Sequence, residues 1–304
     1  MILRLYNYMF RRKIKILDFI LAFVFLSLFT CFLLSSRDIF HRFHPTVHEN
    51  LQLLQDDEFD ISLLRVNSMD KLISYCDSFY EAGYPTQTYP GIVSEVIRKK
   101  FYRGYSFYNI DNNVIGVILE PLVKRGATAI VIPDDILKYP TASCSQQSIV
   151  GMEVFKRKGY NVRKITMFDT ITNVGHFAYE VHYDSSWHFF DTNEEPDRQV
   201  LKKYNRPSTA FLAANPTIIL EAYRSKKDPE LFKRLLMSYK AGPVNVFPAP
   251  NASLYQTVTK WLSYYGWILI LGIILFRYSI LHRRNKRQVM TGERKITYAS
   301  FSNT

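Results

Sequence analysis

Two long apolar segments, one near each end of this 304-residue chain, restrict its possible folds more than any other feature. Residues 16–36 read ILDFILAFVFLSLFTCFLLSS, and residues 261–281 read WLSYYGWILILGIILFRYSIL. A helix rises about 1.5 Å per residue, so each segment is long enough to cross a hydrocarbon layer of roughly 30 Å. The first segment also lacks the polar face that a core helix of a soluble domain would show. We therefore expect two transmembrane helices.

A cleaved signal peptide is the main alternative for the first segment, because basic residues precede it. The apolar run is long and no small-x-small cleavage site follows it, which favours an uncleaved anchor. Trp261, Tyr264, Tyr265 and Trp267 cluster at the start of the second segment, where aromatic rings suit the lipid headgroup level. Arg277 lies one turn from the far end of this segment and can extend its charge to the interface.

The positive charge of the chain is concentrated at its two ends. The formal net charge is +12, of which residues 1–15 carry +5 and residues 277–304 carry +6, leaving about +1 for residues 16–276. A near-neutral middle lacks the basic surface that nucleic-acid binding requires, so no nucleic-acid partner is expected. Because Lys and Arg beside a transmembrane helix mark its cytoplasmic side, both termini are expected in the cytoplasm.

These observations predict a two-pass protein of the inner or plasma membrane whose central part is periplasmic or otherwise extracytoplasmic. The expected regions are a cytoplasmic basic tail at 1–15, a transmembrane helix at 16–36, a juxtamembrane connector at 37–66, an extracytoplasmic domain at 67–257, a transmembrane helix at 258–281 and a cytoplasmic basic tail at 282–304.

Periodicity within the central domain predicts helices first and strands later. Apolar residues recur at three- and four-residue spacing in three stretches, which indicates helices at 68–81, 90–101 and 113–124. Residues 127–133 fit either a short strand or the approach to the next motif, and a further helix is expected to end at Gly159. Alternating patterns then predict a strand at 161–168 and a hairpin of 176–183 with 187–191, followed by two helical stretches within 207–239.

Three residues in this order have the types and positions that a cysteine nucleophile requires. Cys144 stands at a predicted helix start, and a helix N-terminus and a nearby imidazolium both favour the reactive thiolate form of cysteine. His176 opens the first strand of the hairpin and Asp191 ends the second. With the turn at Asp184-Ser185, antiparallel pairing places Asp191 opposite about Ala178, so that His176 and Asp191 share one face. The pattern predicts a nucleophile, an acid–base group and a carboxylate that orients it.

At this point the sequence resembles the transglutaminase-like superfamily of papain-like cysteine enzymes. The resemblance covers roughly residues 138–195 and rests on Cys at a helix start, GHFAYEV on a strand, and WHFFD ending at Asp191. It implies an α+β fold in which the helix carrying the Cys packs on an antiparallel sheet, here between two transmembrane helices. It also implies that Cys144 forms a thioester, that His176 acts as acid and base, and that Asp191 orients His176.

A finer resemblance is to bacterial membrane-anchored members of this superfamily. In them Ser-Gln-Gln follows the Cys, as Ser145-Gln146-Gln147 does here, and an acidic segment containing Pro precedes it, as Pro133–Pro140 does here. The chain departs from well-known transglutaminases in one respect. They use a Trp upstream of the Cys to stabilise the oxyanion, whereas the three Trp residues of this chain all lie downstream of Cys144. Tyr105, Tyr108, Asn109, Gln146 and Gln147 are the alternative candidates for oxyanion or substrate contacts.

Other interpretations of these residues remain open. Cys144 can be a buried structural thiol, or it can form a disulfide with Cys76, although Cys76 lies on the apolar stripe of its own helix. His182 and His188 lie near His176, but they are expected at exposed strand positions, and the Cys2His2 spacing of structural zinc is absent. Neither a metal nor a cofactor is therefore expected.

Two functions follow from the sequence. The first is an enzyme that transfers or hydrolyses acyl groups of a protein or peptide amide, for which a cell-envelope component is a candidate. The second is a non-catalytic module of the same fold that binds or scaffolds partners in cell-envelope or exopolysaccharide assembly. Transport through the apolar segments is disfavoured, because they contain no paired charges that would line a path. The lipid bilayer is an expected partner in either case.

Overall fold

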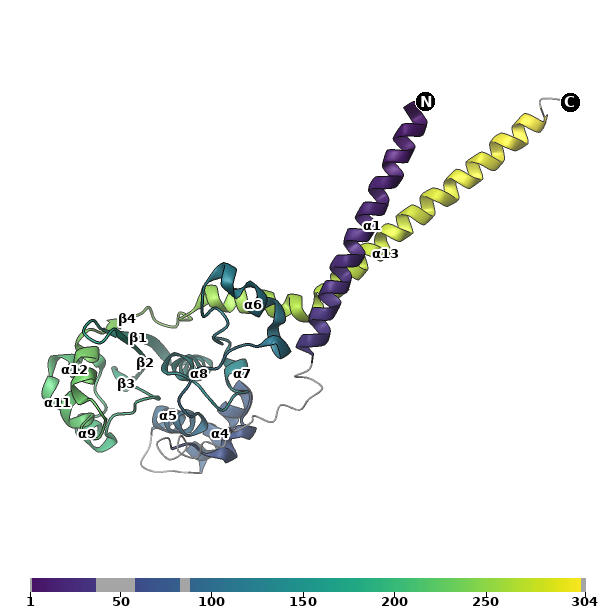
Figure 1. Ribbon diagram of the computed structural model, residues 1–304. Helices are drawn as coiled ribbons and strands as arrows, with labels where there is room; N and C mark the ends of the chain where they lie inside the picture. Colours follow the sequence, from purple (N-terminus) through teal and green to yellow (C-terminus); the bar gives the residue numbers. More distant parts are fainter. Residues whose placement is uncertain (1, 37–57, 83–87, 302–304) are drawn as a thin grey trace. The chain divides into compact units, whose positions relative to one another are not determined.

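The computed structural model describes residues 2–36, 58–82 and 88–301, which fall into two compact units (Figure 1). The helical unit is drawn from Met1–Phe43, Asn109–Leu122 and Thr257–Thr304, and the α+β unit from His44–Tyr108 and Val123–Gln256. Most of the connector expected at 37–66 lies outside the described residues. The stretch 109–122, expected within the central domain, belongs instead to the unit that contains the apolar helices.

A four-stranded antiparallel sheet, with the order β3-β2-β1-β4, forms the centre of the α+β unit. Its strands are β1 (Asn161–Asp169), β2 (Val174–Tyr183), β3 (Ser186–Phe190) and β4 (Lys240–Ala241). The strands predicted at 161–168, 176–183 and 187–191 are thus observed, and the α+β class with an antiparallel sheet is confirmed. The short β4 was not predicted, because two residues carry no alternating pattern.

Helices cover both faces of the sheet (Figure 1). Tyr179 and Phe190 point to one face and pack in a core with helices of the N-terminal half: α4 (Met69–Glu81), α5 (Tyr89–Lys100) and α8 (Cys144–Arg157). Ala178 and Phe189 point to the other face and pack against helices of the C-terminal half: α9 (Arg198–Lys203), α10 (Thr209–Ala214), α11 (Pro216–Ala222) and α12 (Pro229–Met237). Alternation along β2 and β3 therefore buries both faces.

The β2–β3 hairpin has a two-residue loop. Asp184 and Ser185 both have positive φ, 45° and 64°, which is the backbone of a type I′ turn and matches the twist of the flanking strands. The register pairs Tyr183 with Ser186 and Tyr179 with Phe190. Continued by one residue, this register sets Asp191 opposite Ala178, as the sequence predicted.

Helix α8 lies unusually close to β2. A Cβ built on Gly151 would come within 2.9 Å of the Tyr179 ring, so only glycine fits at this point of the helix. The Ser148 hydroxyl also donates a hydrogen bond of 3.2 Å to the carbonyl oxygen of Phe177 in β2. These two contacts fix the height and rotation of α8, and with them the position of Cys144 at its first turn.

Three local expectations differ from the structure. Residues 127–133 make a single bridge, Phe107 with Ala129, and Pro133 then begins the short helix α7 (Pro133–Ile136), because its fixed φ suits a first helical turn. Three helices rather than two occupy 207–239, since Asn215 has a non-helical backbone between α10 and α11. A 3₁₀ helix precedes α4 at Ile61–Arg65.

The helical unit contains α1 (Ile2–Ser35), α6 (Ile110–Val123) and the part of α13 (Pro250–Phe301) from Thr257 onward. Two stretches, Ile16–Ser35 and Pro250–Arg283, are long and apolar enough to span a membrane. The Tyr264 hydroxyl donates to the Ser35 carbonyl oxygen at 2.8 Å, and Arg277 pairs with Asp18 at 2.7 Å. The two apolar helices therefore run antiparallel, with the end of α1 level with the aromatic start of the second apolar segment. The expectation that the apolar segments contain no paired charges is wrong for Arg277 and Asp18, which join one residue of each segment.

Candidate active site

His176 and Asp191 form a buried pair on one face of the hairpin. The Nε2 atom of His176 lies 2.7 Å from Oδ2 of Asp191, and the two side chains are 9% and 1% exposed. Cys144 lies close enough to the same imidazole to contribute to raising its pKa. Because Asp191 occupies Nε2, the nitrogen left for the sulfur is Nδ1. The structure thus brings together the three residues that the sequence placed on one helix and two strands.

The charges of this site reinforce one another. Burial opposes the charged form of His176, but the Asp191 carboxylate and hydrogen bonds with Asp191 and Cys144 outweigh it and raise the pKa of His176 to about 10. Burial likewise acts against the Asp191 carboxylate, yet the imidazolium and the Glu194 backbone N–H hold the pKa of Asp191 below its usual value. At neutral pH the pair is therefore an imidazolium beside a carboxylate.

Asp191 has two further hydrogen-bond donors besides His176. The Glu194 backbone N–H donates to Oδ1 at 2.9 Å, and the Tyr223 hydroxyl donates to Oδ2 at 3.3 Å. Burial and nearby acids raise the pKa of Tyr223 well above its ordinary value, so its hydroxyl stays protonated and remains a donor. The carboxylate is thereby fixed in the orientation that meets the imidazole.

Two aromatic side chains from the C-terminal half of the α+β unit pack beside the imidazole. The edge of Phe232 in α12 meets the His176 ring, with ring centroids 6.2 Å apart, and Tyr223 stacks on Phe232 at 4.3 Å. A bidentate salt bridge from Arg234 to Asp169 ties α12 to the end of β1. Sequence reasoning missed Tyr223 and Phe232, because nothing local in α11 and α12 indicates which strand they cover.

Gln146, a candidate for oxyanion or substrate contact, is a structural side chain in the fold. Its Oε1 accepts from the backbone N–H of Ser106 and of Ser143, at 3.0 and 3.2 Å. Its Nε2 donates to the carbonyl oxygens of Ser106 and Ile130, both at 2.8 Å. Both amide hydrogens are thus engaged, and Gln146 joins the loop before α8 to the helix that carries Cys144.

The other candidates occupy different positions. The Tyr108 hydroxyl is buried and donates to Asp135, so it is committed within the core. The Asn109 side chain accepts from the Asp111 N–H at 3.0 Å, and the residue belongs to the helical unit. Tyr105 is exposed and contacts the Phe107 ring. Gln147 is buried and donates to the Ala142 carbonyl oxygen at 3.0 Å, while its Oε1 has no partner in the described part of the chain.

The first turn of α8 presents backbone N–H groups beside the sulfur. The Gln147 N–H is the first to bond within the turn, to the Ser143 carbonyl oxygen at 2.9 Å. The N–H groups of Cys144 and Ser145 precede it and have no acceptor within the helix, as at any helix start. They are therefore suited to bind a negative oxygen.

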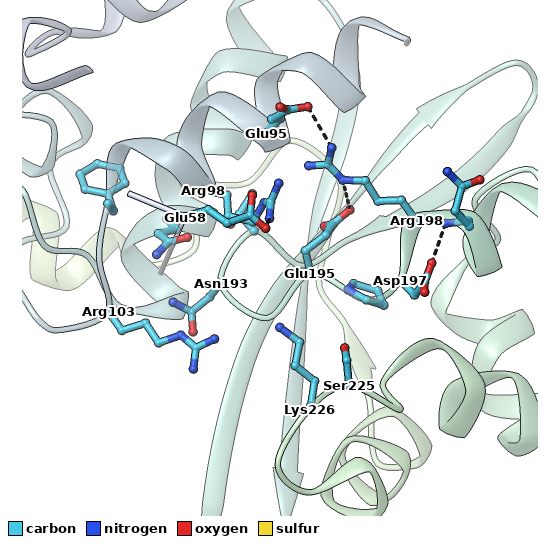
Figure 2. A pocket seen from close by; sticks show the side chains of 15 residues that line it. Glu58, Glu95, Arg98, Arg103, Asn193, Glu195, Asp197, Arg198, Ser225 and Lys226 are labelled. Atoms are coloured by element: carbon cyan, nitrogen blue, oxygen red, sulfur yellow. Dashed lines mark hydrogen bonds and ion pairs between the residues drawn. The ribbon is translucent and has the colours of Figure 1, made fainter. Parts of the chain in front are cut away.

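A polar cavity of about 470 Å³ adjoins the residues that flank the site (Figure 2). Thr192 and Asn193, which directly follow Asp191, line it, as does Gln147, one helical turn after Cys144. Its charged residues are balanced, four basic against four acidic: Arg98, Arg103, Arg198, Lys226, Glu58, Glu95, Glu195 and Asp197. Several form ion pairs, among them Arg198 with Glu95 at 2.9 Å (Figure 2).

Among the described residues, the cysteines and the other histidines do not form a second site. Cys31, Cys76 and Cys144 are all free thiols, so the alternative Cys76–Cys144 disulfide is not formed. Burial, followed by the charge of Asp77, raises the pKa of Cys76 to about 12. His188 is buried rather than exposed, because the carbonyl oxygens of Asn205 and Arg206 cover it along β3. No cluster suited to a metal ion occurs within residues 2–36, 58–82 and 88–301.

No protein-family model matches the sequence, and no curated protein matches it. One solved structure, described as "Crystal structure of a TGase", aligns with 14% sequence identity and a TM-score of 0.25. The alignment covers 52% of this chain and 36% of that one, so this chain spans about a third of its length.

Proposed function

We propose that this protein is a transglutaminase-like cysteine enzyme, anchored in a membrane, that acts on amide or peptide groups outside the cytoplasm. The observation that carries the proposal is the buried His176–Asp191 pair at 2.7 Å, with the free thiol of Cys144, at a helix N-terminus, near enough to contribute to the pKa of the imidazole. A purely structural cysteine needs no such partner, and a structural histidine needs no unpaired thiol beside it.

The proposed reaction runs through a thioester. The Cys144 sulfur attacks the carbonyl carbon of the substrate amide, and the carbon–oxygen double bond becomes an oxyanion. When the carbon–nitrogen bond breaks, His176 gives its proton to the departing nitrogen and the thioester remains. Water or an amine then attacks the thioester, His176 takes a proton from it, and Cys144 leaves as the thiolate. Asp191 keeps the imidazole oriented throughout.

Backbone N–H groups are the oxyanion donors that this proposal assigns. The Cys144 N–H, and the Ser145 N–H next to it, fit the role because they lie at the start of α8 without intrahelical acceptors. A backbone donor also makes an upstream Trp unnecessary. Gln146 and Tyr108 do not take this role, since their donors are engaged elsewhere.

The cavity beside Gln147 and Asn193 is the proposed binding region for the substrate. Its lining is largely polar and includes the side chains of Asn193, Ser225 and Lys226. Such side chains can bond a ligand with both N–H and C=O groups, such as a peptide. The balanced charge of the cavity favours a ligand that is neutral overall.

A peptide-amide affinity probe with a thiol-reactive group tests the enzyme on the full chain in lipid nanodiscs. We expect the probe to modify Cys144, as mapped by mass spectrometry, and to modify Asp191→Asn more slowly. Cys144→Ala is the control for the target, since it retains Cys76 in the core and Cys31 in the apolar helix. Equal labelling of the wild type and Cys144→Ala would show that the site is not a nucleophile.

A non-catalytic binding module is the second candidate, favoured by the polar cavity, which does not include Cys144. This module would still bind a peptide or envelope ligand after Cys144→Ala, and no acyl-enzyme would form with any substrate. Hydroxylamine cleaves a thioester and carries its acyl group away as a hydroxamate, leaving the Cys144 thiolate. Hydroxamate formed by the wild type but not by Cys144→Ala therefore separates the two functions.

A further inference from the structure

Helix α6 exposes a continuous apolar stripe. From Val114 onward it is a regular helix, and Ile115, Ile118, Leu119 and Leu122 recur at three- and four-residue spacing on one face. Ile118 is 61% exposed and Leu122 is 81% exposed. Leaving such a row of large apolar side chains in water is unfavourable, so another phase or molecule is expected to cover the stripe.

The beginning of α6 is fixed to both apolar helices of its unit. Its first N–H groups, which have no intrahelical acceptors, are bonded by side chains: Val114 N–H to Ser35 Oγ at 3.2 Å and Ile115 N–H to Ser263 Oγ at 3.1 Å. The Gly116 N–H donates to Asn113 Oδ1 at 3.1 Å. The Asn113 amide also donates to Thr259 Oγ1 at 3.0 Å. One residue from α1 and two from α13 therefore hold this helix start.

These attachments place the start of α6 at a definite level along the apolar helices. Ser35 ends the apolar segment of α1, and Ser263 lies among the aromatic residues that begin the apolar segment of α13. Trp261 and Tyr265 in this band are about half exposed. Aromatic residues of this kind mark the boundary between acyl chains and headgroups. The start of α6 is therefore level with that boundary.

The composition of α6 fits the boundary better than a full crossing. Ten residues rise about 15 Å, half of the hydrocarbon thickness. Pro121 has no N–H and so leaves the carbonyl of Val117 without its helical partner, which headgroups or water can supply only near the interface. Glu120 lies roughly 160° around the helix from Leu122, away from the apolar stripe. Lys124 and Arg125 follow directly, as suits contact with phosphate headgroups.

We propose that α6 is an interfacial membrane helix, whose stripe of Ile115, Ile118, Leu119 and Leu122 lies among the acyl chains of the bilayer that holds α1 and α13. The proposal rests on the membrane crossing put forward above and goes beyond it. Helix α6 adds a third contact with the lipid. In the sequence, this contact precedes the residues that lead to Cys144.

Site-specific fluorescence on the full chain in phospholipid vesicles tests the proposal. A single cysteine at Leu122 or Ile118, in a Cys31→Ala, Cys144→Ser background that retains the buried Cys76, would carry an environment-sensitive NBD label. We expect blue-shifted emission and quenching by lipids brominated on the acyl chain, as for a label at Leu269 in α13. Ile171 is the matched control, because it is 76% exposed, apolar, and in a turn of the α+β unit; its label should not be quenched.

The outcomes distinguish this proposal from the membrane crossing. Unshifted, unquenched label at Leu122 with quenched label at Leu269 would overturn the interfacial helix and leave the crossing intact. Blue-shifted label at Leu122 without quenching would mean that protein covers the stripe, which also overturns the proposal. Unquenched label at Leu269 would contradict the crossing and the interfacial helix together.

Discussion

Asp191 is the residue on which the chemistry of the site depends most. It receives hydrogen bonds from the imidazole, from a backbone N–H and from a tyrosine hydroxyl, and it is almost fully buried. Buried carboxylates are tolerated only when they are paired in this way. Its charge in turn keeps His176 protonated over a wider pH range than a free histidine. The orientation and the charge of the imidazole therefore have one source.

Asp191→Asn is expected to lower activity and to move its pH dependence. The carboxylate charge that contributes most to raising the pKa of His176 to about 10 is lost, so burial is opposed by Cys144 only and the pKa falls. The alkaline limb of kcat/KM, which reports loss of the His176 proton, should move to lower pH, with a decrease in kcat on the order of 10³–10⁴-fold. pH–rate profiles of both proteins check this. An unchanged alkaline limb would mean that His176 is not the acid.

The same pair contributes to stability with a definite sign. The pKa of His176 is raised above its unfolded value of about 6.5, so its contribution is complete below that pH and is lost as the pH rises through about 10. The pKa of Asp191 is lowered, so its contribution is present above about 3.9 and is lost as the pH falls. The pair therefore stabilises the folded state most between about pH 3.9 and pH 6.5.

Lys100 presents the opposite case, a buried charge without a hydrogen-bond partner among the described residues. Burial lowers its pKa to about 8, below the unfolded value of about 10.4. Below about pH 8 the buried ammonium lowers the free energy of unfolding by its full amount, and this loss decreases as the pH rises to about 10.4. Lys100→Met should raise the free energy of unfolding at pH 7 by about 3 kcal/mol, less any loss of the contact with Phe101.

Urea unfolding at several pH values measures this effect. The difference between Lys100→Met and the wild type should shrink from pH 8 to pH 10. Lys99→Met is the matched control, because Lys99 is next in sequence but pairs with Glu95 at the surface; it should change stability by less than about 1 kcal/mol. Destabilisation by Lys100→Met at every pH would show that the ammonium is stabilised in the fold.

Among the secondary-structure elements, the hairpin was the most predictable, whereas the unit to which α6 belongs could not be predicted. A two-residue turn between two alternating runs determines the register of β2 and β3, and the register determines which residues face Asp191. Tyr223 and Phe232 lie 32 and 41 residues beyond Asp191, and only packing across the sheet brings them to the site. The membership of α6 in the helical unit likewise depends on contacts with Ser35 and Ser263, which no local pattern contains.

Gly151 controls the distance between α8 and β2, and Gly151→Ala is expected to increase it. The added Cβ would come within 2.9 Å of the Tyr179 ring, which is fully buried and cannot withdraw. Overpacking of this kind costs about 1–3 kcal/mol. The probe reaction of Cys144 should also slow, because the first turn of α8 moves with the rest of the helix. Gly126→Ala is unsuitable as a control because its φ is 84°; Gly272→Ala, with open space around it, is the matched variant.

The molecule as a whole combines a near-neutral α+β unit with two apolar helices bounded by basic segments. Helical structure continues through both basic segments, since α1 begins at Ile2 and α13 ends at Phe301. The α+β unit also includes the first turns of α13, where Gln256 bonds the backbone of Ala127, Ala129 and Val131. Neither the hydropathy pattern nor the charge pattern could show these contacts, although the hydropathy pattern located both apolar helices.

The positive ends of the chain predict which side of the membrane the α+β unit faces. Met237 is 56% exposed in α12, so Met237→Cys, in the Cys31→Ala, Cys144→Ser background, should react with a membrane-impermeant maleimide added to intact cells. Arg283→Cys, beside the basic segment after the second apolar helix, should react only after the membrane is permeabilised. The opposite result would place the α+β unit in the cytoplasm and the basic segments outside, which would contradict the prediction from the Lys and Arg residues near the helix ends. Reaction of both positions in intact cells would mean that the second apolar helix does not cross, and the proposed substrate could then no longer be restricted to one compartment.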